Sequence, residues 1–145
     1  MKVIILHNGL FPSYGFPVNH DYAKALYNLG VDVSIIVIGK YSIKDGAEKP
    51  IYPVFCIDEN NYIKRYYKLI KYIKSADILH SVPILGLELI PLFNRKTKYI
   101  YVRLSVSVSG NYVYDVIQNY LKSLQLMFAD YIIYQHSHIP KAIPP

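Results

Sequence analysis

The sequence predicts an α/β fold in which helices cover both faces of a parallel β-sheet. Short runs rich in Val and Ile alternate about five times with longer segments that carry apolar residues at helical spacing. Strands and helices in alternation form βαβ units, which place their strands parallel and side by side. The 145 residues, of which 52% are hydrophobic and 18% charged, are typical of one folded domain.

Each expected strand is a short apolar or β-branched run bounded by turn residues. Residues 3–6 form a continuous apolar run that ends before Asn8 and Gly9, which is typical of a strand buried on both faces. Pro53 weakens the strand expected at residues 51–57. The other expected strands are residues 31–38, 77–81, 98–102 and 130–134.

The expected helices have start and stop signals. Residues 19–29 have helical spacing and precede Gly30, which is typical of a helix C-terminus. A long helix is expected within residues 58–74, opening with the cap-like segment of residues 58–61. Further helices are expected at residues 83–94 and 111–128.

Composition limits the compartment and the partners. The net charge of +6 permits nucleotides, lipid head groups or nucleic acid as partners, without choosing among them. No apolar run approaches the roughly 18 residues of a membrane span, and residues 3–6 are too short for a signal peptide. The lone Cys56 excludes an internal disulfide and favours a cytoplasmic location. His136 and His138 lack a third ligand, so no metal site is expected.

The loop after the first strand carries no dinucleotide fingerprint. Gly9 and Gly15 are too far apart for G-x-G-x-x-G, and no acid follows the second strand to bind a ribose. A nicotinamide cofactor is therefore not expected. The loop does lead into a helix N-terminus, where the free N–H groups of residues 18–21 can hold an anion. The alternative is a plain connecting loop.

Five segments resemble, in order and spacing, the N-terminal domain of GT-B glycosyltransferases of family 4. Residues 15–26 and 30–34 resemble the opening loop, helix and second strand of that family. Residues 76–81 and 129–134 resemble two of its strands that begin with Ala-Asp, and residues 141–145 resemble its crossover to a second domain. The resemblance covers nearly the whole chain.

The resemblance implies that residues 1–145 form a Rossmann-like, acceptor-side domain, one half of a GT-B fold. The C-terminal nucleotide-sugar domain, with its pair of Glu residues, is absent from this chain. The implied enzyme transfers a sugar from a nucleotide-sugar donor to an acceptor hydroxyl, which is lipid-linked in several similar enzymes. It needs no cofactor or metal, and this half alone is expected to be inactive.

The resemblance also implies substrate-binding positions. Gly15 and Phe16 match the loop that faces the donor diphosphate, and Asn19 and His20 match a polar pair in one branch. His20 is expected to contact a phosphate or an acceptor hydroxyl, the alternative being a solvent-facing side chain. His80 follows a strand and points toward the cleft, the alternative being a buried, hydrogen-bonded side chain.

The catalytic position departs from the family pattern. Many members have a His after the strand that matches residues 98–102, and none is present here. Arg103 and Ser105 lie nearby and are the catalytic candidates, because Arg103 offers a fixed positive charge near a phosphate or leaving group. The alternative places Arg103 at the surface of a strand end. The missing His also leaves open a non-catalytic Rossmann-like partner or scaffold module.

Residues 62–74 form a basic helix. Its apolar positions Ile63, Tyr66, Tyr67, Ile70 and Ile73 are expected to share one face, and the lysines of the adjacent face are Lys64, Lys68 and Lys71. One interpretation is an amphipathic helix packed on the sheet with solvated charges. The other is peripheral docking on an anionic membrane at the inner face. A nucleic-acid-binding protein is a weaker alternative, because no RNA or DNA module pattern is present.

Overall fold

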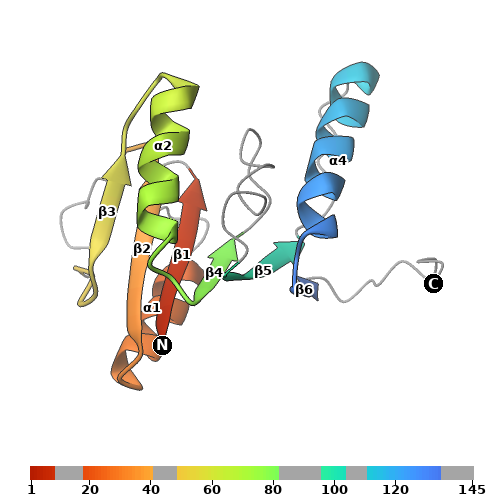
Figure 1. The fold of residues 1–145 in the computed structure, drawn as a ribbon. Coiled ribbons are helices and arrows are strands. Elements are labelled where there is room, and N and C mark those ends of the chain that lie inside the picture. Colours follow the sequence, from red (N-terminus) through yellow and green to blue (C-terminus); the bar gives the residue numbers. More distant parts are fainter. Residues whose placement is uncertain (9–17, 41–48, 82–95, 104–110, 135–145) are drawn as a thin grey trace.

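Parallel strands form a single sheet in the computed structural model, which describes residues 1–8, 18–40, 49–81, 96–103 and 111–134 (Figure 1). Its six strands run in the order β3-β2-β1-β4-β5-β6. The strands are β1 (Lys2–Asn8), β2 (Asp32–Ile38), β3 (Val54–Ile57), β4 (Ile78–Ser81), β5 (Lys98–Arg103) and β6 (Tyr131–Tyr134). The strand order reverses between β1 and β4, and such a switch point is where ligands bind on α/β sheets.

Helices lie on both faces of this sheet, which confirms the predicted fold class. The described helices are α1 (Val18–Asn28), α2 (Tyr62–Ile73) and α4 (Tyr112–Met127). Helix α1 covers one face, and α2 and α4 lie on the other (Figure 1). The helix expected at residues 83–94 lies outside the described residues.

Alternating side chains of the central strands build a separate core on each face. On the α1 face, Val3 and Ile5 of β1 pack with Val33, Ile35 and their neighbours. On the other face, Ile4 and Leu6 belong to a cluster that includes residues of β2, α2, β4 and β5. Strand β1 is thus buried on both sides, as its continuous apolar run predicts.

The aspartates of the two Ala-Asp pairs form hydrogen bonds with the backbone at the start of a neighbouring strand. The Asp77 carboxylate accepts the backbone N–H of Lys2 at 2.7 Å, and the Asp130 carboxylate accepts that of Tyr99 at 2.8 Å. Each aspartate also donates its own N–H to the carbonyl of the same residue, Lys2 or Tyr99. Because both carboxylates bind main chain at the amino edge of the sheet, these aspartates are structural.

Helix ends follow local capping rules. Gly30 has φ +77°, and its N–H bonds the Tyr27 carbonyl while that of Val31 bonds Leu26, so α1 ends in a Schellman motif as the glycine predicts. The N-cap of α2 is Asn61, the last residue of the cap-like segment 58–61. Its side chain accepts N–H groups two and three residues further on, which is the geometry that an N-cap requires.

Helix α2 is rotated relative to the sequence-based prediction. Leu69 and Ile73 are buried against the sheet, whereas Ile63 is 82% exposed and Tyr67 is 73% exposed. The predicted apolar face is therefore wrong at its N-terminal end. Two apolar stripes are compatible with the helical period here, and packing against β1, β4 and β5 selects the one that contains Leu69.

Candidate ligand-binding site

Two histidines mark the carboxyl edge of the sheet near the switch point. His7 is the penultimate residue of β1 and is 5% exposed, and His80 in β4 is 8% exposed. Ile5 pairs with His80 across the two strands, and side chains alternate along a strand. His7 and His80 therefore share the face of the sheet that α1 covers.

The first turn of α1 is tied to this edge by two side-chain hydrogen bonds. The Asn19 amide donates to Nδ1 of His7 at 3.2 Å. Nδ1 of His20 and the hydroxyl of the buried Tyr52 are hydrogen-bonded at 2.5 Å. The alternative of a solvent-facing His20 is thus wrong. A contact of His20 with a phosphate or an acceptor hydroxyl stays a prediction.

His80 carries a buried imidazole with unused hydrogen-bonding capacity. Its ring lies 4.9 Å from that of Tyr22 in α1, and its Nδ1 has no hydrogen-bond partner in the part of the chain that the structure describes. Burial lowers the pKa of His80, which keeps the imidazole uncharged at neutral pH. The predicted burial is confirmed, but the hydrogen bond expected of a structural histidine is not seen among the described residues.

The remaining predicted site residues are described only in part. Arg103 is the last residue of β5 and pairs with Tyr134, so its backbone lies at the same carboxyl edge as His80. Gly15, Phe16 and Ser105 lie outside the described residues, as do His136 and His138. The structure thus brings Asn19, His20 and His80 to one region of the sheet.

Two residues of the candidate site are not predicted by any sequence motif. His7 and Tyr52 hold the first turn of α1 through Asn19 and His20, and neither stands in a recognisable motif. His7 directly follows the apolar run of residues 3–6. A polar residue directly after the apolar run of a first strand is the signal that points to it.

The predicted lysines all lie on α2, on the face of the sheet opposite α1. Lys64, Lys68 and Lys71 are exposed, and Lys68 forms a 2.9 Å ion pair with Glu59. The hydrogen bond from Lys68 lowers the pKa of Glu59. Within the described ranges, no helix is long and apolar enough to cross a membrane, and no cluster of three metal-ligating side chains occurs.

Comparison with known proteins establishes the fold. No protein-family model and no curated protein matches the sequence. Among solved structures, the chain is similar to an alpha-glucosyltransferase in complex with UDP and a 13-mer DNA containing an HMU base, at 14% identity and a TM-score of 0.66. That match covers 92% of this chain and 37% of the other. The chain is also similar to an alpha-glucosyltransferase in complex with UDP-glucose and DNA containing an abasic site, at 14% identity and a TM-score of 0.59. That match covers 91% of this chain and 35% of the glucosyltransferase.

A flavoprotein shares the same architecture. The DNA/pantothenate metabolism flavoprotein from Streptococcus pneumoniae matches 92% of this chain and 81% of its own, at 13% identity and a TM-score of 0.56. Identities this low show the fold alone. The chain therefore has a Rossmann-like α/β fold of the kind found in GT-B glycosyltransferases, and it spans 37% of the length of the first glucosyltransferase. Membership of family 4 stays a prediction.

Proposed function

We propose that this chain is the acceptor-side half of a nucleotide-sugar-dependent glycosyltransferase, and that its ligands occupy the switch point between β1 and β4. The observation that carries the proposal is the buried His80, whose Nδ1 has no hydrogen-bond partner among the described residues, beside the first turn of α1. A buried polar atom without a partner is costly in a folded protein, and a ligand group offsets that cost. The glucosyltransferases with this fold are bound to UDP or UDP-glucose.

Each group at the edge has a distinct task in this proposal. The backbone N–H groups of the first turn of α1 bind an anionic group, with Asn19 oriented by His7 and His20 oriented by Tyr52. The uncharged His80 imidazole exchanges a hydrogen bond with an acceptor hydroxyl. Arg103, at the end of the adjacent β5, supplies positive charge toward a phosphate leaving group.

The proposal extends to the acceptor and to the place of action. Ile63, Lys64 and Tyr67 are exposed together on the N-terminal half of α2. An apolar side chain and a tyrosine beside lysines suit an anionic bilayer, because the apolar groups enter the interface and the ammonium groups stay at the head groups. This surface supports peripheral membrane binding and a lipid-linked acceptor.

The function is tested with the complete protein product of the open reading frame that encodes this chain. It is incubated with UDP-glucose and GDP-mannose, and sugar transfer to a lipid-linked acceptor and to HMU-containing duplex DNA is measured. We expect transfer from one donor, with a decrease of about tenfold in His80→Phe, because one hydrogen bond to the acceptor is lost while the ring is kept. Asn28→Ala, at the exposed end of α1, is the matched control.

Two outcomes contradict the proposal. If the complete product releases no sugar from any donor and instead retains FMN on purification, the flavoprotein likeness describes the ligand better. If it binds neither nucleotide sugar nor flavin and co-purifies with a partner protein, the chain is a non-catalytic Rossmann-like module.

A further inference from the structure

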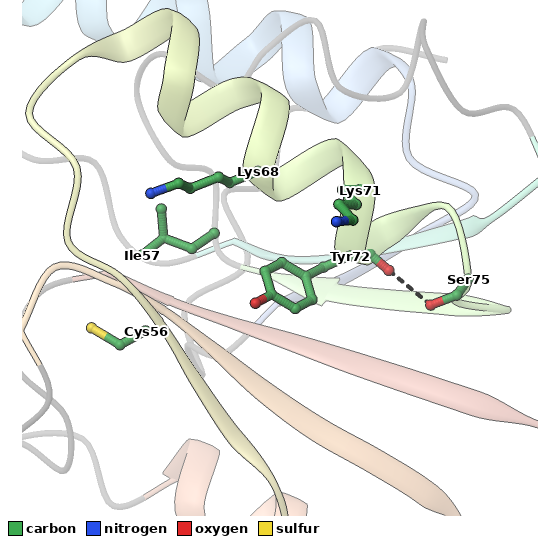
Figure 2. A pocket seen from close by; sticks show the side chains of 6 residues that line it. All are labelled: Cys56, Ile57, Lys68, Lys71, Tyr72 and Ser75. Carbon is green, nitrogen blue, oxygen red and sulfur yellow. Dashed lines mark hydrogen bonds between the residues drawn. The ribbon is translucent and has the colours of Figure 1, made fainter.

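A groove lies on the α2 face of the sheet, away from the switch point. It has a volume of about 410 Å³ and runs between β3 and the C-terminal half of α2. Its lining residues are Cys56, Ile57, Lys68, Lys71, Tyr72 and Ser75 (Figure 2). The groove thus lies beside β3, whereas His80 and the start of α1 lie at β4 and on the opposite face.

The lining is rich in hydrogen-bond donors and contains no carboxylate. The Lys68 ammonium group is paired with the Glu59 carboxylate at 2.9 Å, which balances its charge and fixes its position at the groove. Lys71 is exposed, and its side chain has no hydrogen-bond or ion-pair partner in the described part of the chain. Lys2 Nζ, which lies outside the lining, donates to the Ser75 hydroxyl at 3.0 Å. Lys71 gives the groove an unbalanced positive charge, which favours an anion.

The walls of the groove are partly apolar. Ile57 is buried in the core, and the Tyr72 ring packs on Phe55 with 5.1 Å between ring centroids. The Tyr72 phenol reaches from α2 toward β3 (Figure 2). A preformed concave site of this size, with an apolar wall and a few polar groups, is typical of small-molecule sites.

We propose that this groove binds a phosphate-bearing group through Lys68 and Lys71. Two ammonium groups and the Tyr72 hydroxyl provide donors for a group that carries several acceptor oxygens and more than one negative charge. A soluble phosphate ester and a phospholipid head group share this chemistry. The site is independent of the proposed sugar transfer, because none of its residues belongs to the switch point.

The test is a titration of the folded chain, monitored by the amide NMR signals of Lys71 and Ser75. Inorganic phosphate is the soluble probe, and vesicles of phosphatidylglycerol, compared with phosphatidylcholine, are the lipid probe. The variant is Lys71→Gln and the matched control is Lys74→Gln, which removes the same charge from an exposed position that does not line the groove. We expect Lys71→Gln to weaken binding about tenfold and Lys74→Gln to leave it nearly unchanged, because a charge-assisted hydrogen bond is lost only in the first.

The two probes separate the sources of the phosphate group. Saturable shifts with inorganic phosphate that depend on Lys71 indicate a soluble ligand. Binding to phosphatidylglycerol vesicles alone, again dependent on Lys71 and not on Lys74, indicates a lipid head group. Equal weakening by the two substitutions, or the absence of binding to either probe, overturns the proposal, because the lysines would then act only as diffuse surface charge.

Discussion

At the residue scale, Asp130 shows what a single carboxylate does at the edge of this sheet. One oxygen accepts a hydrogen bond from the backbone N–H of Tyr99, and the other accepts a hydrogen bond from Lys98 Nζ at 2.8 Å. The hydrogen bond from Lys98, followed by that from Tyr99, lowers the pKa of Asp130. The Lys98 ion pair is exposed and adds little, so the bond to Tyr99 is the main contribution.

Asp130→Ala is expected to destabilise the fold by about 1 kcal/mol at neutral pH, because the Tyr99 N–H loses its acceptor. The contribution of a carboxylate with a lowered pKa is present above the unfolded pKa of about 3.9 and disappears as the pH falls through the folded value. Urea unfolding at pH 7 and in the acid range measures both effects. Asp58→Ala, at an exposed position, is the control. Equal stability of the two variants at pH 7 would show that the Asp130 bond contributes nothing.

At the element scale, most helices and strands could be predicted from the sequence, but the rotation of α2 about its axis could not. The apolar runs of β1 and β2 and the glycine after α1 are local signals, and the structure confirms them. The orientation of α2 depends on the facing core, which local periodicity does not contain. The wrong assignment concerns Ile63 and Tyr67, which are exposed beside Lys64.

This exposed end of α2 makes a testable prediction about membranes. Ile63→Ser should reduce the fraction of the chain that co-floats with phosphatidylglycerol vesicles, because about 2 kcal/mol of apolar transfer free energy is lost when the side chain no longer enters the interface. Ile51→Ser, which changes another exposed isoleucine outside α2, should have no effect. Equal reduction in both variants would contradict membrane docking through α2. So would the absence of co-flotation of the unsubstituted chain with phosphatidylglycerol vesicles.

At the scale of the whole molecule, the strand order creates the candidate site. Alternating strands and helices predict parallel strands and place ligands at their carboxyl ends, and this much follows from the sequence. The contacts of His7 with Asn19 and of Tyr52 with His20 join residues far apart in the chain. They could not be predicted, because they depend on how α1 packs on the sheet relative to β1 and to the segment that precedes β3. His80 could be predicted as a site residue because it lies near the carboxyl end of a recognisable strand.

The central claim is that the donor diphosphate of a nucleotide sugar binds at the start of α1, beside the β1–β4 switch point, with the acceptor at His80. Its most direct test is a titration of the complete protein product with UDP, followed by the amide and imidazole ¹⁵N signals of Asn19 and His20. We predict saturable shifts at these two residues and no matching response to FMN. Shifts confined to other parts of the chain, or signals of these residues that respond to FMN and not to UDP, would contradict the claim.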